Sequence, residues 1–135
     1  MPPLPPLPPF ETLTTPPKCS ADVCLVPIGT GAPSIANEIA AIQRLLAASG
    51  LVYTMHSAGT TIDGTWDEVM RVIGQCHTLV HGMGIVRIQS DIRVGTRTDK
   101  IQALEDKITS VQRILRDTEE QQEEAAGTDI PSILS

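Results

Sequence analysis

Hydrophobic and polar residues alternate in short blocks that predict strands and helices in a definite order. The run Ala21–Ile28 is almost entirely apolar, and it is too short for a stable helix and contains Pro27, so we expect a strand. After a loop at 29–33, apolar residues recur at intervals of three and four as far as Ser49. This spacing predicts an amphipathic helix, which Gly50 ends.

A strand pair and a second helix follow. The β-branched and aromatic residues of Leu51–Ser57 and Gly59–Asp63 predict two short strands. Thr65 and Glu68 form a capping box, in which the threonine hydroxyl accepts from a backbone N–H three residues on and the glutamate reaches back. A helix therefore begins here and extends to about Gly82. Its predicted buried face consists of Val69, Ile73, Cys76 and Val80.

The segment Ile85–Val94 alternates between two kinds of side chain, as expected for a strand with one covered face. The mainly apolar set consists of Val86, Ile88, Ser90, Ile92 and Val94. The polar set consists of Arg87, Gln89, Asp91 and Arg93. We expect the apolar set to pack on helices and the polar set to face water or another subunit, because a strand covered on both faces would not carry these charges.

The predicted order is strand–helix–strand–strand–helix–strand, followed by one more helix from about Asp99. This is the split βαβ pattern of a ferredoxin-like α+β domain, an antiparallel four-stranded sheet with helices on one face. The apolar stripe of the extra C-terminal helix has two possible roles. It is either the core face of an amphipathic helix or a heptad-like seam that packs along another helix. Its apolar residues step by three and four: Ile101, Leu104, Ile108, Val111 and Leu115.

Both ends of the chain differ in composition from this domain, which we assign to residues 19–116. Residues 1–18 are rich in proline and predict a disordered leader with a polyproline II tendency. Its Pro-Pro-Leu-Pro-Pro spacing suits the groove of an SH3 or WW domain, and the alternative is a solvated leader without a partner. Residues 117–135 are acidic and poor in apolar side chains, so we expect a disordered tail.

Composition argues against several functional classes. The net charge of −6, with one Phe, one Tyr and one Trp, opposes a nucleic-acid-binding surface, which needs a basic excess and stacking rings. The apolar stretches are too short to cross a membrane, and the N-terminus lacks the basic and apolar regions of a signal peptide. The three cysteines form no disulfide framework, so we expect reduced thiols in a cytoplasmic protein.

Two loops carry the residue types of a small-molecule site. The first, Gly29–Ser34, connects a strand to a helix start that Ser34 is expected to cap, and backbone N–H groups there favour an anion. It lacks the glycine and lysine positions of nucleotide-binding loops, and turn geometry alone is an alternative reason for its glycines. Near the second loop, His56, Thr60 and Thr61 place an imidazole and two hydroxyls around Gly59. These groups predict a small polar pocket.

The sequence contains no evident catalytic or metal-binding constellation. His56 and Ser57 are adjacent in a predicted strand and point to opposite faces, and no Gly-x-Ser-x-Gly elbow is present. An enzyme with His56 as general base remains the alternative. His77 and His81 lie one helical turn apart, but no further ligands accompany them. We therefore expect a binding protein that is not an enzyme and uses neither a cofactor nor a metal.

Several motifs resemble the thiamine-binding protein family, long known only as an uncharacterised protein family. The similar segments are Pro27–Gly31, Gly59–Gly64, Trp66–Val69, Arg87-Ile88, Gly95–Lys100 and Leu104–Lys107. The resemblance covers about Val23–Arg116 in the same order, and it leaves out the leader and the acidic tail. Family members commonly carry a Gly-Met or Pro-Met pair where this chain has Ser57-Ala58.

The resemblance implies that protomers pair their sheets edge to edge as homodimers, which stack into a homotetramer. Charged residues of the open sheet face would then lie at subunit interfaces: Arg87, Asp91 and Arg93. The resemblance also implies that thiamine or its pyrimidine moiety is bound and not transformed. By motif, it assigns ligand binding to Gly29, Thr30, Ser34, Gly59 and Thr60, and the residue pattern adds His56.

Overall fold

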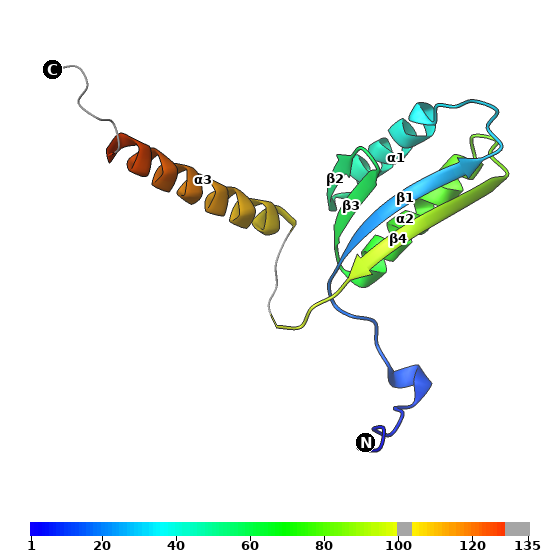
Figure 1. Ribbon diagram of the computed structural model, residues 1–135. Helices are drawn as coiled ribbons and strands as arrows, with labels where there is room; N and C mark the ends of the chain where they lie inside the picture. Colours follow the sequence, from blue (N-terminus) through cyan, green and yellow to red (C-terminus); the bar gives the residue numbers. More distant parts are fainter. Residues whose placement is uncertain (100–103, 129–135) are drawn as a thin grey trace. The chain divides into compact units, whose positions relative to one another are not determined.

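The computed structural model describes residues 1–99 and 104–128. Its order of secondary structure is the predicted one, strand–helix–strand–strand–helix–strand and a final helix (Figure 1). The elements are a 3₁₀ turn at Phe10–Thr12, β1 at Cys19–Ile28, α1 at Ala36–Ser49, β2 at Val52–His56, β3 at Gly59–Gly64, α2 at Trp66–His81, β4 at Arg87–Gly95 and α3 at Leu104–Thr128.

The four strands form one antiparallel sheet in the order β2-β3-β1-β4, which confirms the ferredoxin-like α+β fold. The long strand β1 pairs with β3 over Cys19–Val23 and with β4 over Ser20–Ile28. From Cys24 onward, β1 therefore has β4 on one side and, among the described residues, no strand on the other. This unequal pairing leaves one edge of β1 open beside the β2–β3 hairpin.

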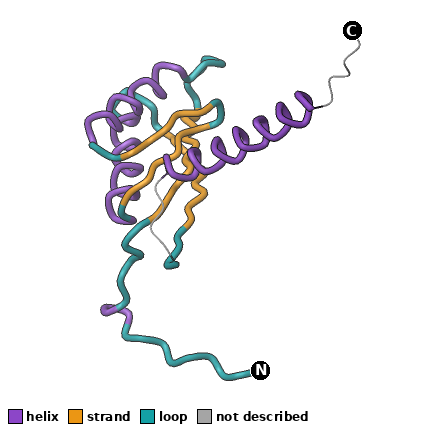
Figure 2. The backbone as a smooth tube through the Cα atoms, turned by 90° about the vertical axis from the view of Figure 1, so that its left-hand side faces the viewer, coloured by secondary structure: helices purple, strands orange, loops and turns teal. Residues whose placement is uncertain are grey.

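Helices α1 and α2 cover one face of the sheet, and the hydrophobic core lies between the two layers. Figure 2 shows both helices on the same side of the strands. Leu46, Ile62 and Val69 have no exposed surface, and full burial of such a side chain contributes about 1.5–3 kcal/mol. The buried hydrophobic residues are Cys19, Ala21, Val23, Leu25, Ile42, Leu46, Ile62, Val69, Val72, Ile73, Cys76 and Val80.

Local signals set most helix boundaries as predicted. The Thr65 hydroxyl accepts a hydrogen bond from the Glu68 backbone N–H at 3.1 Å and caps α2. Gly50 ends α1 with a φ of 77°, a left-handed conformation that favours glycine. Ser34 differs slightly from the prediction, because α1 begins at Ala36, and the Ser34 hydroxyl accepts from the Ala36 N–H at 3.3 Å.

Strand β4 confirms most of the predicted alternation. Ile88 and Val94 pack against the core, whereas the four residues of the polar set are exposed. Two predicted core residues are corrected. Val86 precedes the strand and is 92% exposed, and Ile92 is 42% exposed because β4 is an edge strand.

Helix α3 extends farther than expected. Residues 117–128 are helical where the sequence predicted a disordered tail, and that prediction is corrected for this stretch. Glu, Gln and Ala are strong helix formers, and no proline interrupts them. Helix α3 falls in the second of two units, and the predicted domain boundary at residue 116 stays a prediction. The predicted positions Lys100 and Ile101 lie outside the described residues. No described helix is long and apolar enough to span a membrane.

Gly59 supports a test of the packing between β1 and β3. A Cβ added there would lie 2.5 Å from the Val23 carbonyl oxygen. We expect Gly59→Ala to lower the free energy of unfolding by about 1–3 kcal/mol, because the strands must shift to accept the methyl group. The control Gly74→Ala, on α2 with open space around it, should stabilise by about 0.5–1 kcal/mol. Urea unfolding measures both, and wild-type stability of Gly59→Ala would contradict this packing.

Candidate ligand-binding site

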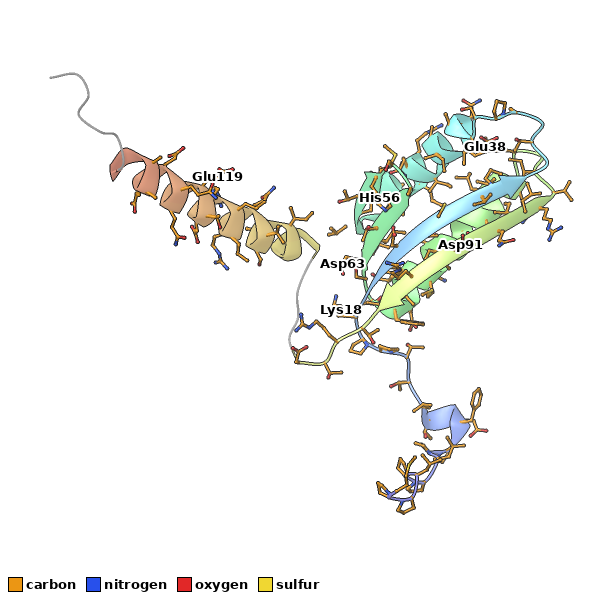
Figure 3. The ribbon with its side chains drawn as sticks, in the orientation of Figure 1. Lys18, Glu38, His56, Asp63, Asp91 and Glu119 are labelled. Atoms are coloured by element: carbon orange, nitrogen blue, oxygen red, sulfur yellow. The ribbon has the colours of Figure 1, made fainter. Side chains whose placement is uncertain are left out.

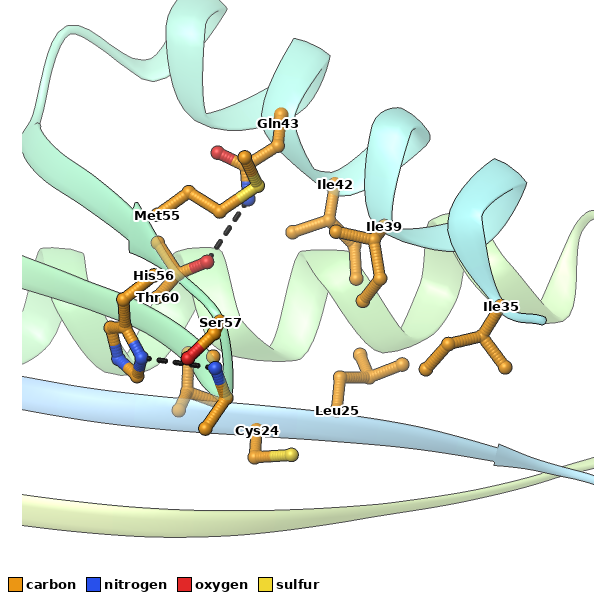
Figure 4. A pocket seen from close by; sticks show the side chains of 13 residues that line it. Cys24, Leu25, Ile35, Ile39, Ile42, Gln43, Met55, His56, Ser57 and Thr60 are labelled. Atoms are coloured by element: carbon orange, nitrogen blue, oxygen red, sulfur yellow. Dashed lines mark hydrogen bonds between the residues drawn. The ribbon is translucent and has the colours of Figure 1, made fainter. Parts of the chain in front are cut away.

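A cavity of ≈ 240 Å³ lies between α1 and the β2–β3 hairpin, beside the open edge of β1 (Figure 4). Four parts of the chain contribute to it: β1, the N-terminal half of α1 with the residue before it, β2 with the hairpin turn, and β3. The lining residues are Val23, Cys24, Leu25, Ile35, Ile39, Ile42, Gln43, Met55, His56, Ser57, Ala58, Gly59 and Thr60.

The cavity follows from where the strands end. β3 begins at Gly59 and pairs with β1 no farther than Val23, so the hairpin stops while β1 continues. The apolar stripe of α1 lies across this gap. In Figure 4, Ile35, Ile39 and Leu25 gather at one end of the cavity and the polar side chains at the other. The cavity is therefore apolar along one wall and polar at one end, as small-molecule sites commonly are.

Thr60 and Gln43 form the polar end. Thr60 is 5% exposed, and its hydroxyl oxygen accepts a hydrogen bond from Gln43 Nε2 at 3.0 Å. A threonine hydroxyl also has one hydrogen to donate, and the glutamine side chain has an oxygen that accepts. This bond uses neither of these groups. The pair therefore presents a donor and an acceptor side by side.

His56 connects the β2–β3 hairpin to β1 through a hydrogen bond to Asp22. Its Nε2 lies 2.6 Å from Asp22 Oδ1, and the Ala58 N–H donates to its Nδ1 at 3.2 Å. Since Nδ1 accepts, the neutral ring carries its hydrogen on Nε2 and donates it to the carboxylate. The His56 ring also lies over Gly59, with Cε1 3.5 Å from the position of a Cβ there, an ordinary contact distance. Both ring nitrogens are thus engaged.

The structure brings together three of the six predicted ligand residues: His56, Gly59 and Thr60 line the cavity. It also adds Gln43 and Met55, which the sequence analysis missed. The sequence could have indicated Gln43, because it is a polar residue four positions after Ile39 on the core-facing side of α1. For Met55, the sequence contains no indication beyond its position near the end of a strand.

The other three predicted residues, Gly29, Thr30 and Ser34, are not among the lining residues. The Thr30 hydroxyl accepts from the Ala32 N–H at 3.3 Å, within its own loop. Gly29 has a φ of 80°, a conformation that favours glycine. Turn geometry, the alternative reason for this motif, therefore accounts for the glycine. Ile35, directly after Ser34, is the residue of this region that reaches the cavity.

The helical histidines have separate partners. His77 Nε2 lies 2.7 Å from Ser90 Oγ, and His81 Nδ1 lies 2.7 Å from the Ile85 carbonyl oxygen. Within residues 1–99 and 104–128, no group of three metal-ligating side chains gathers at one point. The pair therefore joins α2 to β4 and to Ile85, two residues before the strand.

The three cysteines are free and differ in burial. Burial raises the pKa of the Cys76 thiol to about 11. Burial also raises the pKa of Cys19, and the negative charge of Asp63 adds to this effect. Neither thiol is a good nucleophile at neutral pH, because the thiolate is the reactive form. Cys24 is half-buried and lines the cavity.

The predicted interface residues lie on the sheet face turned away from α1 and α2. Arg87, Asp91 and Arg93 are exposed there, and Asp91 is labelled on β4 in Figure 3. The strand register sets Arg93 opposite Asp22 and Asp91 opposite Cys24. The same face also exposes three apolar side chains to 38–40%: Val26, Ile28 and Val52. We call this surface the open face.

Sequence comparison places the chain among known proteins. Residues 21–112 match the family described as thiamine-binding protein. The chain is 49% identical over 96 residues to the UPF0045 protein ECM15 of Eremothecium gossypii, covering 71% of this chain and 91% of that protein. It is 45% identical over 97 residues to the UPF0045 protein sll0230 of Synechocystis, covering 72% and 79%.

Solved structures share the fold. The hypothetical protein MJ1052 of Methanocaldococcus jannaschii aligns with a TM-score of 0.64 and 24% identity, over 71% of this chain and 97% of that one. TM0486 of Thermotoga maritima, provisionally described as a thiamine biosynthesis/salvage protein, aligns with a TM-score of 0.61 and 17% identity, over 70% and 99%. These identities support the fold alone. The family match spans more than half of the sequence, and the chain belongs to the thiamine-binding protein family.

Proposed function

We propose that this protein binds thiamine or a related aminopyrimidine in the cavity between α1 and the β2–β3 hairpin, without transforming it. The observation that carries the proposal is the Thr60–Gln43 pair, joined by a 3.0 Å hydrogen bond at one end of a largely apolar cavity. Membership of the thiamine-binding protein family supports the choice of ligand.

The chemistry of this pair suits an aminopyrimidine. Such a ring carries an exocyclic amine, which donates, beside a ring nitrogen, which accepts. The Gln43 oxygen and the Thr60 hydroxyl hydrogen offer the complementary acceptor and donor. The flat ring itself would lie against Ile39 and Met55, since a thioether makes favourable contacts with aromatic rings.

The charge of the lining favours a ligand without phosphate. None of the lining residues is Lys, Arg, Asp or Glu. Phosphate groups are bound most strongly by charge-assisted hydrogen bonds from such cations as Arg and Lys, and the lining offers none.

Several features support a binding role over the general-base alternative. A general base needs a free lone pair, but His56 Nδ1 accepts from Ala58 and Nε2 faces Asp22. Burial keeps the Cys19 and Cys76 thiols protonated at neutral pH. Three free cysteines are also in keeping with a reducing, cytoplasmic setting.

Isothermal titration of the full chain with thiamine tests the proposal. We expect saturable binding of thiamine and at least about tenfold weaker binding of thiamine diphosphate, because the added phosphates lose water without gaining a cationic partner. The variant Thr60→Val should weaken thiamine binding by about tenfold, since it removes one hydrogen bond and leaves Gln43 without its partner.

The neighbouring Thr61→Val is the matched control. Thr61 pairs with Asp22 on the open face and is not a lining residue, so thiamine binding should stay at the wild-type level. The absence of any heat and any thermal shift with millimolar thiamine would refute the proposed function. An equal effect of both variants would refute the role of the Thr60–Gln43 pair.

We further propose that the open face joins copies of this chain as a homodimer or homotetramer. Charges of both signs alternate there with partly exposed apolar side chains, as at a polar subunit interface. Asp22 and Arg93 face each other across one strand pair, with Val26 farther along the same face. A second open face would cover these apolar groups and satisfy the charges.

Sedimentation velocity tests this association. We expect the wild-type chain to sediment as a dimer or tetramer, and Val26→Lys to shift it toward the monomer because a buried unpaired charge is costly. Leu79→Lys is the matched control: Leu79 is 38% exposed, as Val26 is, but lies on α2. This control should retain the wild-type mass. A monomeric wild-type chain would contradict the proposed interface.

A further inference from the structure

The proline-rich leader lies outside the residues that match the family, which begin at residue 21. Its first nine residues contain six prolines, and they form neither helix nor strand and are exposed throughout. Pro9 has a φ of −54° and a ψ of 131°, close to polyproline II geometry. The ring of each proline fixes φ near this value, so the segment is stiff before it meets any partner.

The spacing of the other residues matches the polyproline II repeat. This helix has three residues per turn, so Leu4 and Leu7 share one edge, and Phe10 follows three residues later at the start of the 3₁₀ turn. Their side chains are 91%, 88% and 86% exposed. The prolines occupy the two remaining edges as the series Pro2, Pro5, Pro8 and Pro3, Pro6, Pro9. The segment thus presents a row of large apolar side chains flanked by proline rings.

Charge and aromatic content indicate the kind of partner. Residues 2–10 contain no charged side chain, so their recognition would depend on apolar contact and shape. Proline rings pack best in grooves lined by aromatic side chains. This chain cannot supply such a groove itself, because Tyr53 and Trp66 are its remaining aromatic residues and both are half-buried against the core. The partner is therefore a different protein.

We propose that residues 2–10 are a docking segment for a protein domain with an aromatic-lined, proline-binding groove. The boundary of the segment is set by the turn that follows it. The Thr12 N–H and hydroxyl both donate to the Pro9 carbonyl oxygen, at 3.0 and 2.8 Å. Beyond this turn, the Thr15 hydroxyl donates to Asp67 Oδ1 at 2.8 Å. This bond links the C-terminal part of the leader to the start of α2. The stiff segment needs little further ordering to bind, which favours association.

Binding of the full-length chain to a panel of purified SH3, WW and EVH1 domains tests the proposal, with fluorescence anisotropy as the readout. We expect at least one domain to bind saturably. The double variant Leu4→Ala/Leu7→Ala should weaken that binding by about tenfold or more, because two apolar contacts are lost. Leu13→Ala removes an exposed leucine that follows the 3₁₀ turn, outside residues 2–10, and should leave affinity unchanged.

Two results would overturn the proposal. One is the absence of binding across the whole panel. The other is binding that Leu4→Ala/Leu7→Ala retains in full, or that Leu13→Ala reduces equally. Thiamine titration of the same variants separates this inference from the proposed cavity, because none of the three leucines is a lining residue.

Discussion

The unequal pairing of β1 with its two neighbours determines where this protein has its cavity. β4 accompanies β1 over Ser20–Ile28, whereas β3 stops at Val23. Exposed strand edges present unpaired backbone groups that a protein must cover, pair or leave to a ligand. Here the start of α1 and the hairpin turn at Ser57-Ala58 surround the open edge without filling it. The cavity is the space that remains.

The alternation of β1 divides the protein into surfaces with different roles. Ala21, Val23 and Leu25 point toward the helices and are buried in the core. Asp22 points the other way, where it holds His56 and faces Arg93 on the neighbouring strand. The His56–Asp22 contact connects the hairpin with the open face. The cavity beside the hairpin and the open face are therefore adjacent in this fold.

Periodicity predicted the fold well because core positions repeat with the period of each element. The alternation of β4 and the capping of α2 by Thr65 are local patterns, and both are present in the structure. The predicted end of the last helix, at about residue 116, was wrong because Glu, Gln and Ala favour a helix even in an acidic stretch. The predicted burial of Val86 was wrong because the alternation of residue types does not reveal where a strand begins.

Three of the six predicted ligand residues line the cavity, and the sequence alone did not group them with Gln43. His56, Gly59 and Thr60 are close in sequence, so a local pattern was enough to group them. Gln43 reaches Thr60 through the packing of α1 on the sheet, and a single sequence does not give that packing. The loop at 29–34 carries a ligand-like motif whose glycine is explained by its turn.

A crystal structure of the protein grown with thiamine is the most direct test of the proposed site. We expect density for the pyrimidine ring between Ile39 and Met55, with its amine and ring nitrogen bonded to the Gln43 oxygen and the Thr60 hydroxyl. Thiamine bound elsewhere on the protein, with this cavity empty at saturating ligand, would contradict the proposed site.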